Sequence, residues 1–162
     1  MKKILSIMIV VWGIAVLCTL FMSSCKRPEV LDNSTLVNSA RNVALTFGPA
    51  YVPFFKEANV SDVQVFKKKD YGGDSRPQIR KQIGRKFYTV TFTYDSTAVK
   101  FDFGFAARVR IWKDTGEPLD VIFGNGWGRN FFFLSFKEQT DHSANDYEKV
   151  ASDSIVKVPL QT

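Results

Sequence analysis

The sequence gathers its positive charge in one segment, which makes that segment the first candidate for binding chemistry. Residues 67–86 (KKKDYGGDSRPQIRKQIGRK) contain eight Lys or Arg and two Asp, a formal charge of +6. This equals the net charge of the whole chain, so the positive excess lies here. Such a concentration favours an anionic partner, either phospholipid or lipopolysaccharide headgroups or an acidic protein surface. The alternative is a solvated, mobile hairpin loop that binds nothing. The candidate binding residues are Lys67, Lys68, Lys69, Tyr71, Arg80 and Lys81.

A glycine-rich segment, residues 124–130 (GNGWGRN), is the second candidate site. Its glycine spacing differs from the dinucleotide-binding fingerprint, and the segment that follows is expected to be a strand rather than a helix. Asn125-Gly126 predicts a tight hairpin. An exposed Trp127 beside Arg129 would stack on a sugar or on a partner protein. The alternative is a Trp127 that packs back onto the sheet.

Residue types that carry catalysis or bind metals are scarce. His142 is the only His, and it lies between Asp141 and Ser143. These are the residue types of a catalytic triad, but adjacency in sequence does not produce triad geometry. The two Cys, Cys18 and Cys25, are too few for a disulfide scaffold or a four-Cys zinc site. The sequence therefore predicts no enzyme, no metal and no cofactor.

The first 25 residues (MKKILSIMIVVWGIAVLCTLFMSSC) have the order of a secretory signal. Two Lys are followed by an apolar run over residues 4–22, two Ser and then Cys25. This pattern resembles the lipobox of bacterial lipoproteins, in the relaxed form of Bacteroidetes-type members. The resemblance implies cleavage before Cys25, a diacylglycerol on its sulfur and an acylated amine. Two alternatives stay open, an uncleaved transmembrane anchor and plain secretion.

The same segment predicts a location. Lys2 and Lys3 keep the amino end inside and place the domain outside the cytoplasm, where nucleic acid is not an expected partner. In enteric-type sorting an Asp after the lipidated Cys retains a lipoprotein in the inner membrane, and this chain has Lys26 there. We therefore expect a protein of the cell envelope, in the outer membrane and facing the periplasm. Acyl chains on Cys25 would hold it to the membrane.

Composition and length predict one globular domain behind this leader. Hydrophobic residues make up 45% and charged residues 23%, which excludes disordered and low-complexity classes. The 15 Phe predict a core built from large rings. We divide the chain into a signal peptide (1–24), a polar tether (25–33) and a single domain (34–162).

The hydrophobic period identifies the elements of that domain. Apolar residues at helical spacing predict a helix over 35–47, with Ser34 as its cap. After Val60 the period changes to two, which predicts strands. The expected strands are 63–67, 88–94, a long strand 99–111 bent at Gly104, 119–123, 131–137 and an edge strand 155–160, with a short helix after Asp141 that contains Tyr147, Val150 and Ala151.

Two of these strands carry further expectations. On the long strand, Asp102, Arg108 and Arg110 share the polar face and predict cross-strand ion pairs. Trp112 ends that strand on the face opposite its Phe residues and is a second aromatic binding candidate. Residues 131–137 (FFFLSFK) are apolar on both faces and predict a central strand.

The predicted fold class is α+β, with the N-terminal helix packed on an antiparallel meander sheet. The alternative is a β-sandwich with a helical preface, which a strand 131–137 apolar on both sides would favour. The predicted function is a non-enzymatic, membrane-anchored envelope lipoprotein that serves as a binding or assembly component of a larger complex. The alternative is a lipoprotein that binds a glycan or another small ligand.

Overall fold

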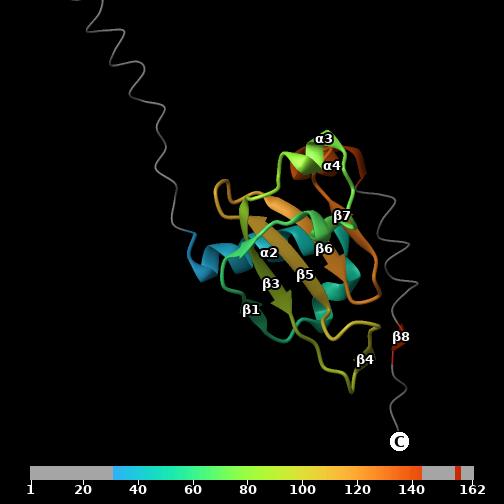
Figure 1. Ribbon diagram of the computed structural model, residues 1–162. Coiled ribbons are helices and arrows are strands. Elements are labelled where there is room, and N and C mark those ends of the chain that lie inside the picture. The colour runs from blue at the N-terminus through green and yellow to red at the C-terminus, as the bar shows by residue number, and fades with distance from the viewer. Residues whose placement is uncertain (1–30, 144–155, 158–162) are drawn as a thin grey trace, which may run out of the picture. The chain divides into compact units, whose positions relative to one another are not determined.

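An antiparallel sheet organises the chain in the computed structural model, which describes residues 31–143 and 156–157 (Figure 1). The sheet has the order β1-β3-β5-β6-β7, with β2 also paired to β3. A separate two-stranded sheet joins β4 and β8. The α+β class predicted from the sequence is confirmed. The strands are β1 (Ala58–Val60), β2 (Gln64–Val65), β3 (Lys86–Phe92), β4 (Val99–Lys100), β5 (Ala107–Trp112), β6 (Pro118–Phe123), β7 (Gly128–Asn130) and β8 (Val156–Lys157).

The helical elements lie before, between and after these strands. None of the helices in the described ranges is long and apolar enough to cross a membrane. The predicted leader, Cys25 and the expected helix around Tyr147 lie outside the described residues. The helices are α2 (Asn33–Phe47), η1 (Pro49–Phe54), η2 (Lys68–Tyr71), α3 (Pro77–Arg80) and α4 (Phe136–Ser143).

Helix α2 forms where the period of 3.6 predicts it, but its cap is Asp32 and not Ser34. The Asp32 carboxylate accepts a hydrogen bond from the Thr35 backbone N–H at 2.7 Å, the usual N-cap interaction. The Ser34 hydroxyl only donates to that carboxylate, at 3.1 Å. Helix α2 buries the predicted apolar face, whose fully buried members are Leu36, Ala40, Val43, Ala44 and Phe47.

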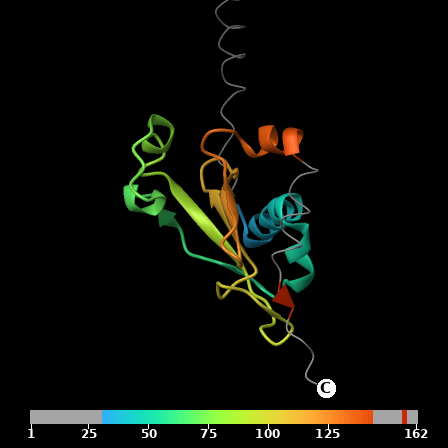
Figure 2. The same cartoon turned by 90° about the vertical axis from the view of Figure 1, so that its right-hand side faces the viewer.

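This apolar face packs on one side of the sheet and forms the larger core (Figure 2). In β5 the alternation is regular, since Ala107, Val109 and Ile111 are buried beneath α2. Val90 and Phe92 of β3 and Val121 and Phe123 of β6 join them from the neighbouring strands. Ring stacking extends this core to η1, where the Tyr51 ring lies 4.6 Å from that of Phe123.

The predicted long strand 99–111 is two strands, β4 and β5, separated by a bend. The cause is a close approach to Gly124 rather than a bulge at Gly104. Two backbone hydrogen bonds join the bend to Gly124. The Phe103 N–H donates to the Gly124 carbonyl, and the Gly124 N–H donates to the Ala106 carbonyl, both at 2.9 Å. A Cβ on Gly124 would lie 2.5 Å from the Phe105 carbonyl oxygen, so only glycine fits there.

The predicted central strand 131–137 is also wrong. Strand β7 ends at Asn130, and α4 begins at Phe136. Ser135 and Glu138 form a capping box, because the Glu138 carboxylate accepts from the Ser135 N–H at 2.7 Å and the Ser135 hydroxyl accepts from the Glu138 N–H at 3.3 Å. The support for a β-sandwich therefore disappears. Of the predicted edge strand 155–160, the structure describes Val156–Lys157 as β8, paired with β4.

Candidate functional site

The basic segment 67–86, hereafter the basic unit, is a folded part of the molecule and not a mobile hairpin loop. It contains η2 and α3 and lies on the sheet face opposite α2 (Figure 2). A second aromatic core fixes it there, in which Phe66 and Ile79 are fully buried against Phe87, Trp112 and Leu119. The Phe66 ring meets the edge of Trp112, with centroids 5.7 Å apart. The basic unit is therefore a rigid surface feature.

Local sequence explains the path of the basic unit. The Asp70 carboxylate accepts a hydrogen bond from the Lys67 N–H at 2.6 Å and so fixes the start of η2. Gly72 and Gly73 follow with φ of +58° and +77°, a conformation that side chains disfavour. The Asp74 carboxylate then accepts from the Arg76 N–H at 2.9 Å, and Pro77 opens α3.

Most cations of the basic unit are exposed to solvent, and two of them form ion pairs. Arg76 is paired with Asp74 and Arg85 with Asp114, both at 2.6 Å. Tyr71 differs from the other candidates, because it is half-buried and its ring packs on Phe132 at 4.8 Å. Its role is to hold the unit on the second core. The side chains that are exposed and form no ion pair with any described residue are Lys67, Lys68, Lys69, Arg80 and Lys81 of the predicted set, together with Lys86.

An ion pair between β5 and β6 supports this side of the sheet. Arg110 was expected to form a cross-strand pair, and its partner is Asp120, a residue that the sequence did not single out. The Arg110 Nε donates to both carboxylate oxygens of Asp120, at 2.9 and 3.0 Å, and Nη2 donates to one of them. The Arg110 side chain is 16% exposed, and that of Asp120 is 7% exposed. Arg108 has a different contact, over the Phe105 ring at 4.2 Å.

Burial and pairing act in opposite directions on this pair. Burial raises the pKa of Asp120, because the desolvation of its carboxylate outweighs the hydrogen bonds and the positive charge of Arg110. Desolvation also opposes the charge of Arg110, but the hydrogen bonds and negative charge of Asp120 outweigh it and raise the pKa of the guanidinium. Arg110 therefore stays a cation, held in one orientation.

Two pockets border the basic unit. The first, of about 380 Å³, lies between η2 and the sheet. It is lined by Gln64, Val65, Lys67, Lys69, Asp70, Phe87 and Arg110.

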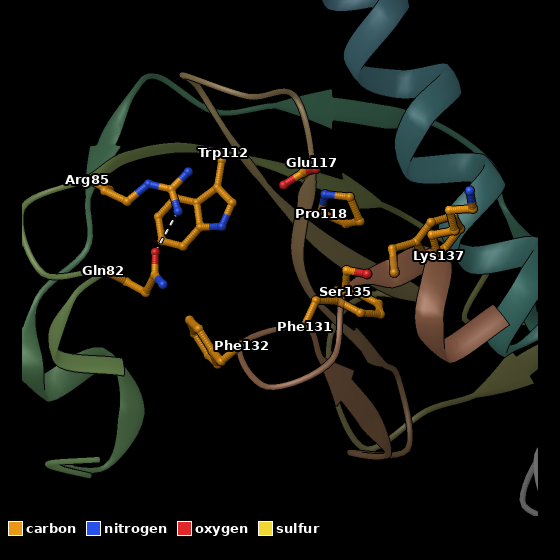
Figure 3. Close-up of a pocket in the computed structure, with 10 residues that line it drawn as sticks. Gln82, Arg85, Trp112, Glu117, Pro118, Phe131, Phe132, Ser135 and Lys137 are labelled. Carbon is orange, nitrogen blue, oxygen red and sulfur yellow. Dashed lines mark hydrogen bonds between the residues drawn. The ribbon is translucent and has the colours of Figure 1, made fainter. Parts of the chain in front are cut away.

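The second pocket, of about 410 Å³, lies between the basic unit and the start of α4 (Figure 3). Trp112, Phe131, Phe132 and Phe136 give it aromatic walls. The guanidinium of Arg85 covers the Trp112 ring at 4.0 Å and donates to Gln82 at 2.5 Å. Trp112 does lie on the predicted face, but it is only 5% exposed.

The hairpin that contains Trp127 and Arg129 forms as predicted. Both residues lie on the sheet face that packs against α2, opposite the basic unit. Arg129 is paired with Val121, which belongs to the core under α2. Trp127 is half-buried, stacks on Phe123 with centroids 5.4 Å apart, and lies 5.9 Å from the Arg129 guanidinium. Trp127 therefore packs back onto the sheet, which is one of the two possibilities that the sequence left open, and is not an exposed stacking residue. The structure does not bring this hairpin together with the basic unit.

Comparison with protein-family models, known proteins and solved structures finds no match to this chain. The geometry of the site is thus the basis for its interpretation. In the part of the chain that the structure describes, no group of three or more His, Cys, Asp or Glu could hold a metal ion. What the geometry offers is a fixed cationic surface with pockets on either side.

Proposed function

We propose that this chain is a membrane-anchored envelope lipoprotein that serves, without catalysis, as a binding or assembly component of a larger complex. Lipidated Cys25 would anchor it, with the domain outside the cytoplasm on the periplasmic side of the outer membrane. Its basic unit would engage an anionic partner. The observation that carries this proposal is that six cations of the basic unit are exposed and form no ion pair with any described residue, on a unit with its own core.

The rigidity of the basic unit favours binding over a merely solvated role. A mobile loop loses conformational freedom when it binds, and that loss opposes association. The burial of Phe66 and Ile79 in the second core reduces this entropy loss, because the basic unit is already ordered before it binds. The unpaired charges then attract an acidic surface and speed the encounter.

Site-specific photo-crosslinking in intact cells tests the proposal. A photoreactive residue replaces Lys81 in the basic unit or, as a matched control, Lys100 in β4. Both side chains are exposed, and β4 lies at the end of the molecule away from α3 (Figure 1). We expect a discrete adduct from position 81, lost when Lys68 and Arg80 are changed to Glu. Equal adducts from both positions, or none from position 81, would contradict the proposal.

The anchor has its own test. Cells are labelled with an alkyne analogue of palmitate, and the protein is recovered and scanned for the label. The wild-type chain should carry the label, and Cys25→Ala should not. A labelled Cys25→Ala chain would contradict acylation at this residue.

The second pocket favours one alternative, a small ligand or glycan. Its volume of about 410 Å³ lies within the range of small-molecule sites, and its walls are aromatic. A ligand there would quench Trp112, which lines the pocket, and spare Trp127 on the other face. Titration with oligosaccharides should therefore quench the fluorescence of Trp127→Phe as much as that of the wild type. Quenching confined to Trp127 would exclude this pocket as the binding site.

A further inference from the structure

We propose that the first pocket, between η2 and the sheet, binds a phosphate group. The group would belong to a free phosphate or phosphomonoester, or to the headgroup of a lipid. This inference deepens the proposed function, on which it rests, by naming the chemistry that the basic unit recognises. The pocket of about 380 Å³ is larger than a phosphate ion and leaves room for the molecule that carries the group.

Three cations line this pocket, and each has a donor to offer. Lys67 and Lys69 are exposed and form no ion pair with the residues that the structure describes. Arg110 uses Nε and Nη2 on Asp120, whereas its Nη1 forms no hydrogen bond within the described chain. The Gln64 amide, at the same wall, adds a neutral donor.

The acidic groups nearby do not cancel these charges. Asp120 is already paired with Arg110. Asp70 lines the pocket, but one of its carboxylate oxygens is committed to the Lys67 backbone N–H. The three cations against these two carboxylates leave a positive site. A phosphate monoester, with a charge of about −1.5 to −2 at pH 7 and three acceptor oxygens, matches these donors better than a carboxylate with one charge.

The pocket is also organised before a ligand arrives. Asp120 fixes the Arg110 guanidinium, which lies 5.3 Å from the Phe87 ring centroid and 5.9 Å from that of Phe66. A buried ion pair of this kind adds little to stability compared with an apolar pair, so its gain is the orientation of the cation. Preorganised charge loses less entropy on binding.

The test is phosphate binding by the full chain in nonionic detergent, measured by isothermal titration calorimetry. Lys67→Ala combined with Lys69→Ala should weaken inorganic phosphate at least about tenfold, since each removes a charge-assisted hydrogen bond. Lys100→Ala combined with Lys113→Ala is the matched control, because it also removes two exposed cations but neither residue lines the pocket. It should change the affinity less than about twofold.

Two further measurements check the sign of the electrostatics. Asp70→Asn keeps an acceptor oxygen for Lys67 but removes a negative charge, and it should tighten phosphate binding. Inorganic phosphate should bind more tightly at pH 7.5 than at pH 5.5, because it gains much of its second negative charge between these values, whereas sulfate carries two charges at both and should bind alike. Equal losses in the control variant and in Lys67→Ala with Lys69→Ala, or no phosphate binding at millimolar concentration, would overturn the proposal. Circular dichroism confirms that each variant is folded.

Two probes separate the sources of the phosphate group. A soluble ligand is supported if glycerol 3-phosphate and inorganic phosphate bind with similar affinity and phosphatidic acid in mixed micelles binds no more tightly. Phosphatidic acid that competes with phosphate and binds at least about tenfold tighter would support a lipid headgroup. If phosphate fails to bind while position 81 still crosslinks, the pocket assignment is wrong and the proposed function stands. If phosphate binds but no adduct forms, the proposed function fails instead.

Discussion

The Arg110–Asp120 pair allows a quantitative test of how this side of the sheet is held together. In Asp120→Asn, Arg110 keeps its charge but loses its counter-ion. Removing one partner of a buried ion pair costs about 3–5 kcal/mol. The Arg110 side chain is 16% exposed, and the Asn carbonyl still accepts one hydrogen bond, so we expect the lower end, about 3 kcal/mol.

Urea unfolding of the full chain in detergent, followed by circular dichroism, measures this loss. With a urea slope of about 1.5 kcal/mol per M, the midpoint should fall by about 2 M. The control is the double variant Arg110→Met with Asp120→Leu, which removes both charges and keeps their volume. Its stability should lie within about 1 kcal/mol of the wild type. A loss below about 1 kcal/mol in Asp120→Asn, or an equal loss in the double variant, would refute the reasoning.

Three other stability predictions use the same measurement. Asp32→Ala should cost about 1 kcal/mol as the N-cap of α2, whereas Ser34→Ala should cost little, because Ser34 caps no backbone group. Gly124→Ala should cost about 3 kcal/mol or more, because its Cβ would meet the Phe105 carbonyl, whereas Gly104→Ala has open space around it and should be tolerated. Stability should fall as the pH drops below 3.8, because the folded state lowers the pKa of four carboxyl groups through hydrogen bonds and must lose those interactions when they are protonated. A stability that rises steadily towards pH 2 would contradict this sign. These groups are Asp32, Asp74, Asp95 and Asp114.

Periodicity predicted the elements that pack against the core under α2. Helix α2 buries one apolar face in this core, and strands β5 and β6 place alternate apolar residues in it, so the hydrophobic spacing of all three is regular. The α+β class followed from these elements. Local turn chemistry was equally informative at Asn125-Gly126, where the hairpin between β6 and β7 forms as expected.

The errors arose where a distant contact overrides the local pattern. Residues 99–111 alternate like one strand, but Gly124 draws the bend at 101–106 towards itself. Residues 131–137 look like a buried strand because aromatic side chains on an irregular segment share the same composition. The Ser135–Glu138 spacing, a capping box, was a signal in the sequence that would have revealed α4.

The ion pair of the candidate site could not be predicted from the sequence either. The register between β5 and β6 shifts by one residue between Arg110 and Ile111. This shift places Asp120 rather than Leu119 opposite Arg110. The Leu119 side chain packs in the second core. Since a shift of one residue exchanges the two faces of a strand, the partner of Arg110 depends on a bulge that composition does not encode.

The two cores on opposite sides of the sheet have a consequence for how this molecule can change. Strands β3, β5 and β6 contribute some side chains to the core under α2 and others to the second core, so the backbone of the sheet separates the two cores. Substitutions in the basic unit can therefore accumulate without repacking α2. The sheet backbone thus insulates α2 from changes on the opposite face, so that face can be redesigned for another partner while the helical layer stays intact.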